Sequence, residues 1–166
     1  PELQMGHILG DAIEAPVLLI KTCWGGKSLH VDFRPPSAGV ETGSYYHKMI
    51  AEYREALEAI DKEFPQLAGR PRQLSGFVWF QGWNDQYQDR WLTYEENMAN
   101  FIRDVRREFK APDIKFVIGQ MGHDGLKPDK EDSPRDYIKK AQASVPEYPE
   151  FKGNVLCVKT DRYWDQ

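Results

Sequence analysis

Strand-like and helix-like segments alternate along this chain, and the alternation restricts its fold more than any other feature of the sequence. Short apolar runs rich in β-branched or aromatic residues predict four strands, at residues 17–23, 77–80, 114–119 and 154–160. Amphipathic patterns, several of them ended by proline, predict helices at residues 6–15, 44–64, about 94–109 and 135–145. Because a helix separates each strand from the next, we expect an α/β domain with a mostly parallel sheet and right-handed crossovers.

The second predicted strand leads into a polar turn. Residues 77–80 (FVWF) are apolar without alternation, which is typical of a parallel strand that is covered on both faces. Residues 81–85 (QGWND) are mostly polar and follow where the strand leaves the sheet. In open α/β sheets, ligands bind at this carboxyl edge. An ordinary Asn-Asp turn after a strand is the alternative interpretation of these residues.

Two other predicted strands end in similar turns. Trp24, Gly25 and Gly26 follow the first strand, and residues 120–123 (QMGH) follow the third. The two glycines permit positive φ and close approach of backbone N–H groups to a ligand. Parallel strands place all three turns at one edge of the sheet, so we expect them to converge on one site.

The composition argues against several kinds of partner. With 166 residues, 40% of them hydrophobic, the chain can bury the core of one domain, and we expect residues 1–166 to form a single one. A net charge of −4 leaves no basic face for a phosphate backbone, so nucleic acid is not an expected partner. No run of about 18 apolar residues is present, so we expect no membrane span. No cofactor is expected, and the oligomeric state is left open.

The cysteines and the first residue bear on compartment and completeness. Cys23 and Cys157 each close an apolar run, so buried thiols are favoured, while a disulfide between them stays open. The sequence starts at Pro1 rather than Met, and we therefore expect the true amino terminus to lie upstream. A secreted or periplasmic location is suspected, with the signal peptide outside this chain.

Three motifs together resemble a known superfamily. They are WGGKSL at residues 24–29, FVWFQGWND at residues 77–85 and IGQMGHDG at residues 118–125. In this order, each at the end of a predicted strand, they resemble the SGNH hydrolases, and most of all the sialate O-acetylesterase-like group related to carbohydrate esterase family six. The pattern Gly82-x-Asn84-Asp85 matches the third block of that superfamily, and Gly25-Gly26 matches the second.

This resemblance implies a fold and a reaction. The fold is a flavodoxin-like three-layer α/β/α arrangement, and the reaction is ester hydrolysis through a serine acyl-enzyme, commonly on acetylated sugars. Acyl transfer needs hydrogen-bond donors aimed at the oxygen that becomes negative in the tetrahedral intermediate. A backbone N–H of Gly25 or Gly26 and the side-chain amide of Asn84 are the expected oxyanion-hole donors.

The sequence departs from the family pattern in two blocks. The nucleophile block, usually GQSN or GDS, and the DxxH block of the base are both missing. We therefore expect the nucleophilic serine and the histidine base to lie outside these 166 residues, and the chain alone to be inactive. We also expect the first, central strand to be missing, which would leave an empty strand position between residues 17–23 and 77–81.

Several other side chains are candidate substrate contacts. Trp24 and Trp83 would stack on a sugar ring or pack under the glycine turns. Arg34 would hold a substrate carboxylate, or it would pair with an aspartate, Asp32 or Asp85. Ser28 would contact substrate or stabilise its turn.

Two further candidates come from the later turns. Gln81 would orient Asn84 or donate to the substrate, while Asp85 is expected to fix its loop. His123 follows a strand end and would enter the crevice.

Two other classes of function remain open. The domain could be a non-catalytic carbohydrate-binding or structural relative that keeps an aromatic crevice without a nucleophile. It could also be a metal-dependent hydrolase that uses His123, Asp124 and Asp85. No HxH or HExxH spacing supports the latter, so we expect no metal site.

Overall fold

The computed structural model describes residues 2–164 and divides them into two compact units. The first unit contains the chain up to Trp24 together with Met49–Arg70, and the second contains Gly25–Lys48 and the chain from Pro71 onward. The second unit holds the sheet and almost all of the predicted site residues. The single-domain organisation expected from length stays a prediction.

The sheet of the second unit has three parallel strands. They are β1 (Gly76–Trp79), β2 (Lys115–Gly119) and β3 (Val155–Val158), in the order β1-β2-β3. In the register, Phe77 lies opposite Phe116, which lies opposite Val155. The prediction of an α/β fold with a parallel sheet is confirmed.

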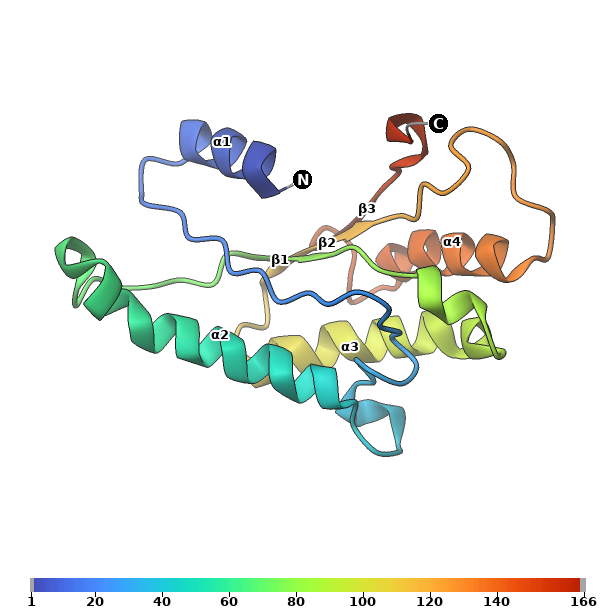
Figure 1. Cartoon of the computed structure of the whole chain (residues 1–166), viewed down its shortest axis with the longest axis horizontal. Helices are drawn as coiled ribbons and strands as arrows, with labels where there is room; N and C mark the ends of the chain where they lie inside the picture. The colour runs from blue at the N-terminus through green and yellow to red at the C-terminus, as the bar shows by residue number, and fades with distance from the viewer. Residues whose placement is uncertain (1, 165–166) are drawn as a thin grey trace. The chain divides into compact units, whose positions relative to one another are not determined.

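Two helices cover one face of this sheet. They are α3 (Tyr94–Glu108) and α4 (Pro134–Ser144), which pack against each other and lie on the same side of the strands (Figure 1). Phe101 of α3 packs against Trp79, with the ring centroids 4.5 Å apart, and Phe77 stacks on Phe116 at 4.8 Å. Helix α3 buries most of its residues because its apolar stripe faces these rings.

The opposite face of the sheet is exposed. Val78 of β1 is 52% exposed and Leu156 of β3 is 59% exposed, whereas Phe116 and Val155 on the covered face are 1% and 6% exposed. Phe80, just after β1, is 60% exposed. The prediction that residues 77–80 are buried on both faces is therefore wrong, because no described helix of this unit covers the second face.

The first unit contains helices and an extended segment. Helix α1 (Glu2–Ala12) is followed by residues 17–23, which have no regular secondary structure, and by α2 (Ser44–Glu63), whose first five residues belong to the second unit. The strand predicted at residues 17–23 is therefore wrong. A strand needs a neighbour for its ladder hydrogen bonds, and the described residues of this unit contain no other strand. The empty strand position expected beside this segment involves both units and stays a prediction.

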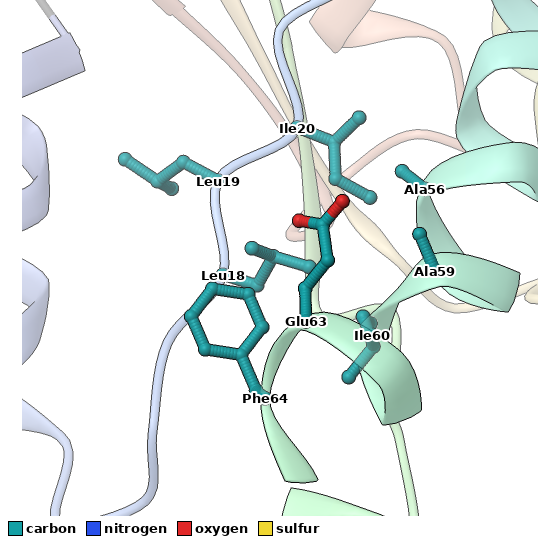
Figure 2. A pocket seen from close by; sticks show the side chains of 8 residues that line it. All are labelled: Leu18, Leu19, Ile20, Ala56, Ala59, Ile60, Glu63 and Phe64. Atoms are coloured by element: carbon teal, nitrogen blue, oxygen red, sulfur yellow. The ribbon is translucent and has the colours of Figure 1, made fainter.

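An apolar hollow lies between the extended segment and α2 within the first unit. It has a volume of about 290 Å³, and Figure 2 shows Leu18, Leu19 and Ile20 on one side of it and Ala56, Ile60 and Phe64 on the other. None of the predicted site residues lines this hollow. Among residues 2–164, no helix combines the length and apolar character needed to cross a bilayer.

Candidate functional site

The glycine turn and the turn after β1 meet in the second unit. Gly26 has φ of +73°, a left-handed conformation that strongly favours glycine. A Cβ added to Gly26 would lie 3.6 Å from Nδ2 of Asn84, whereas a Cβ on Gly25 would have no neighbour within 4 Å. Asn84 belongs to the 3₁₀ turn Trp83–Gln86, which follows the end of β1. Two of the expected donors, the Gly26 backbone and the Asn84 amide, therefore lie side by side.

Asp85 ties these two turns together. Its side chain is fully buried and accepts hydrogen bonds from the backbone N–H of Leu29 at 2.8 Å and of His30 at 2.9 Å. The Gln81 amide donates a third, at 2.6 Å. Burial raises the pKa of the Asp85 carboxyl, and these hydrogen bonds oppose that rise. The role expected for Asp85, fixing the loop, agrees with these contacts.

The side-chain amide of Gln81 donates its hydrogen bonds to groups other than Asn84. Its Nε2 donates to the Lys27 carbonyl at 2.9 Å as well as to Asp85. Because Lys27 directly follows Gly26, this bond fixes the backbone next to the glycine turn. Gln81 thus holds the two turns in place, and its amide hydrogen bonds go to Lys27 and Asp85 rather than to Asn84.

A buried polar network supports the turns from below. Gln142 of α4 is fully buried, donates to the Gln81 carbonyl at 2.8 Å and accepts from the Met121 N–H at 2.9 Å. The Tyr94 hydroxyl also donates to the Gln81 carbonyl, at 2.8 Å. Gln142 therefore joins the carboxyl ends of β1 and β2. Gln142 was not among the predicted site residues, although a glutamine on the apolar helix face that it shares with Ile138 and Val145 was a usable signal.

Ser28 and Arg34 lie in the loop that follows the glycine turn. Ser28 is fully buried, and its hydroxyl donates to the Asp32 carboxylate at 3.0 Å and accepts from the Val31 N–H at 3.2 Å. These contacts describe turn stabilisation. Arg34 donates to the backbone carbonyl of His30 at 2.5 Å. It also donates to the Glu41 carbonyl, and within residues 2–164 it pairs with neither Asp32 nor Asp85.

Three aromatic rings gather at the same edge of the sheet. The His123 ring lies between two indoles, with its centroid 4.4 Å from that of Trp83 and 4.8 Å from that of Trp164. Trp83 and Trp164 are 45% and 44% exposed. We refer to these three residues as the aromatic wall. Trp164 was not among the predicted site residues, although the parallel strand predicted at residues 154–160 ends at this edge just before it.

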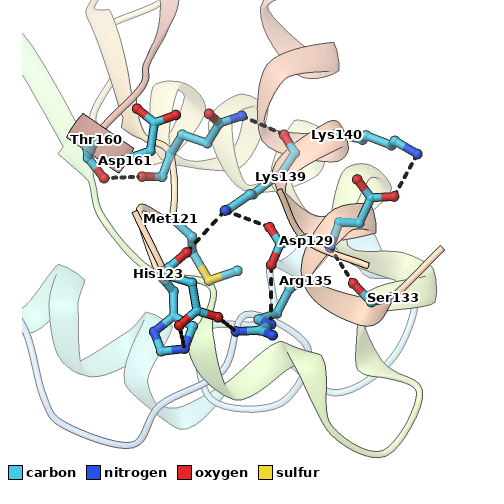
Figure 3. Close-up of polar contacts among 12 residues, drawn as sticks. Met121, His123, Asp129, Ser133, Arg135, Lys139, Lys140, Thr160 and Asp161 are labelled. Carbon is cyan, nitrogen blue, oxygen red and sulfur yellow. Dashed lines mark hydrogen bonds and ion pairs between the residues drawn. The ribbon is translucent and has the colours of Figure 1, made fainter. Parts of the chain in front are cut away.

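Charged groups beside the aromatic wall are paired. Arg135 forms ion pairs with Asp124 and Asp129, and Figure 3 shows the Lys139 ammonium between Asp129 and the His123 carbonyl. The hydrogen bond from Arg135 lowers the pKa of Asp124. In this network, Arg135 and Lys139 are balanced by Asp124 and Asp129.

The remaining predictions fall outside this cluster or concern other chemistry. Trp24 belongs to the first unit, and its role as a sugar contact stays a prediction. Both cysteines are free; Cys23 is exposed, so the expectation that it is buried is wrong. Burial raises the pKa of Cys157 to about 11.

No group of three or more His, Cys, Asp or Glu side chains suited to a metal ion occurs within residues 2–164, and both Asp85 oxygens already accept N–H donors.

Comparison with solved structures shows the fold. A crystal structure of an Arabidopsis thaliana protein, determined at 1.6 Å resolution, matches this chain with a TM-score of 0.50 and 17% sequence identity. The match covers 71% of this chain and 40% of the other. The likeness is consistent with the flavodoxin-like α/β/α fold that the motifs imply.

Comparison with protein families shows the relationship. Among curated proteins, no match to the chain was found. A family model described as "Carbohydrate esterase, sialic acid-specific acetylesterase" matches residues 1–164, which is nearly the whole sequence. The motifs at the three turns agree with that match. The chain therefore belongs to the sialic acid-specific acetylesterase family of carbohydrate esterases.

Proposed function

We propose that the full-length protein hydrolyses acetyl esters on carbohydrates through a serine acyl-enzyme. In this reaction a serine hydroxyl attacks the acetyl carbonyl, and a base takes up its proton. The carbonyl oxygen becomes an oxyanion, and when this intermediate collapses the sugar oxygen leaves with the proton that the base held, while the acetyl group stays on the serine. Water then attacks the acetyl-serine ester with help from the same base, which releases acetate and regenerates the serine. The attacking serine and its base are expected outside residues 1–166.

The residues of this chain would stabilise the oxyanion. The observation that carries the proposal is the placement of Gly26 beside Asn84, with 3.6 Å between a Cβ built on Gly26 and Nδ2 of Asn84. The backbone N–H of Gly25 or Gly26 and the Asn84 amide then act as the donors. Asp85 and Gln81 hold these donors in position before the substrate arrives, which is what makes such a site effective.

Replacement of Asn84 tests this assignment. In the full-length protein, Asn84→Ala is expected to lower kcat on 4-nitrophenyl acetate by about 100-fold to 1000-fold, because one oxyanion donor is lost. KM should change much less, because the oxyanion exists only in the transition state. Steady-state kinetics measure both constants.

A neighbouring amide provides the control. Gln86 lies in the same 3₁₀ turn and is exposed where it donates to the Trp83 carbonyl, so Gln86→Ala should leave kcat within about twofold. Labelling with a fluorophosphonate probe, followed by peptide mapping, identifies the nucleophile. Full activity of Asn84→Ala would refute the oxyanion hole. A full-length protein with neither labelling nor hydrolysis would instead be a non-catalytic relative.

A further inference from the structure

The aromatic wall has the exposure of a binding surface rather than of a core. An indole that serves only as packing is usually well buried, yet Trp83 and Trp164 each keep nearly half of their surface in solvent. Their rings are nevertheless fixed, because each lies edge-on to the His123 ring, with interplanar angles of 65° and 76°. Large exposed aromatic groups that are held in this way mark ligand-binding surfaces.

All three strands contribute to the aromatic wall. Trp83 follows β1, His123 follows β2 and Trp164 follows β3, so the rings gather at the carboxyl edge where α/β sheets bind ligands. Trp83 also immediately precedes Asn84 in the same 3₁₀ turn. The wall is therefore continuous with the turn that carries the expected oxyanion donor.

Close contacts between the turns after β2 and β3 bring the Trp164 ring beside His123. The Thr160 hydroxyl donates to the Gln120 carbonyl at 2.6 Å (Figure 3). A Cβ added to Gly122 would lie 2.5 Å from the Thr160 hydroxyl oxygen and 2.7 Å from its carbonyl atoms. Only glycine therefore allows the turn after β3 to approach the turn after β2 so closely. This contact brings the chain of Trp164 alongside His123.

The chemistry of the wall selects the kind of ligand. A pyranose ring presents an apolar face of C–H groups, which packs well on an indole, and hydroxyl groups at its rim that remain hydrated. Arg135 and Lys139, beside the wall, are already paired with Asp124 and Asp129, so these two cations are not free to hold an anionic ligand. Shape and apolar contact are what the wall offers.

We infer that Trp83, His123 and Trp164 form the stacking surface for the pyranose ring that carries the ester, with Trp164 as a residue that determines selectivity for sugar esters. This inference rests on the proposed function. The aromatic wall would recognise the sugar, and the glycine turn and Asn84 would act in the chemical step.

Kinetics on two kinds of ester separate these roles. The sugar substrates are the O-acetylated methyl glycosides of N-acetylneuraminic acid, glucose and xylose. In the full-length protein, Trp164→Ala should raise KM for at least one of them by about tenfold, which is equivalent to about 1.4 kcal/mol. Its kcat/KM for 4-nitrophenyl acetate, which has no sugar ring, should stay unchanged. Trp164→Phe should recover most of the affinity because a ring remains.

A neighbouring aromatic residue is the matched control. Tyr163 is 69% exposed and lies next to Trp164, and its ring contacts Arg162 rather than His123. Tyr163→Ala should therefore leave KM unchanged for every substrate. Urea unfolding of each variant checks that the turn after β3 remains folded. Equal KM values for Trp164→Ala and the unmodified protein on all three sugar esters would overturn the inference.

A binding measurement keeps this inference separate from the proposed function. The non-acetylated methyl glycosides of the same three sugars are titrated against the full-length protein, and tryptophan fluorescence is recorded. At least one of the three glycosides should change the tryptophan fluorescence, and the size of that change should differ in Trp164→Phe, which lacks this indole. Binding without ester hydrolysis would support the wall and refute the enzymatic proposal. Asn84-dependent hydrolysis without any response to the three glycosides would refute the wall alone.

Discussion

Asp85 shows how one buried side chain can organise a site without taking part in its chemistry. It is fully buried, and its two carboxylate oxygens accept two backbone N–H groups from the loop after the glycine turn and the amide of Gln81. The sequence predicted this role because an aspartate after a strand commonly accepts from nearby backbone groups. The partners, 55 and 56 residues away in the sequence, could not be predicted.

Other residues show where prediction from sequence fails at this scale. The sequence predicted that Gly26 and Asn84 lie close together, because each belongs to a family motif at the end of a predicted strand. For Ser28 and Arg34 the sequence left two roles open, a substrate contact or a contact within the protein. Which role applies depends on the hydrogen-bonding groups that the folded loop brings within reach. Both side chains bind loop groups within seven residues, so local backbone geometry, which composition does not reveal, decided the contacts.

Asp85→Asn provides a test by pH dependence. Burial raises the folded-state pKa of Asp85 above its ordinary value of 3.8, so the folded state keeps this proton to a higher pH than the unfolded state does. The contribution of this group to the free energy of unfolding is then fully present below that ordinary value and is lost as pH rises through the raised pKa. Asn84 and Gln81 are unchanged in the variant.

The measurement is urea unfolding of both proteins at a series of pH values from about 4 to 7. The free energy of unfolding of the unmodified protein minus that of Asp85→Asn should fall as pH increases. A difference that rises with pH would mean that the hydrogen bonds, rather than burial, dominate the pKa of this carboxyl.

At the scale of elements, the end of β1 and the end of β2 are joined through a helix rather than directly. Gln142 of α4 binds the Gln81 carbonyl and the Met121 N–H, and the Tyr94 hydroxyl of α3 binds the same carbonyl. Both helices therefore contribute a polar group to the edge that carries the site. This arrangement fixes the turns to the sheet rather than leaving them to move independently.

Gln142→Leu tests this connection. The change leaves the Met121 N–H without its partner in a buried position, so the free energy of unfolding should fall by about 1 to 3 kcal/mol. Urea unfolding measures the loss. Lys140→Ala on the same helix removes an exposed ion pair with Asp136 and should cost at most about 0.5 kcal/mol. Equal losses in the two variants would show that the Gln142 network adds nothing beyond a surface contact.

Most elements followed from periodicity, and one did not. The four helices occur within a few residues of their predicted positions, and three strands do as well. Residues 17–23 have the composition of a strand but no described strand beside them in their unit. Strand formation depends on a partner elsewhere in the chain, which a local apolar pattern does not contain.

At the scale of the whole molecule, the sheet has one covered face and one exposed face. The apolar pattern of β1 predicted burial on both faces. Such a pattern shows that the side chains are suited to burial, but it does not show whether another layer covers them. Val155 and Leu156 are neighbours on β3 that point to opposite faces, with exposures of 6% and 59%. They therefore form a matched pair for testing the layers.

The comparison uses Val155→Ala and Leu156→Ala in the 166-residue chain. Val155→Ala should lower the free energy of unfolding by about 1 to 3 kcal/mol, because it removes buried methyl groups. Leu156→Ala removes more carbon but should cost less than about 0.5 kcal/mol, because the side chain is already in solvent. Chemical unfolding measures both. A large cost at Leu156 would mean that another layer covers the second face.

The contact between Gly122 and Thr160 has a consequence for how relatives of this protein could diversify. Trp83 shares its turn with Asn84, so changes there would affect turnover and recognition at once. Trp164 depends instead on two later turns that hold no part of the expected oxyanion hole. New substrate preferences could therefore arise by remodelling those two turns while the hydrolytic machinery is inherited intact.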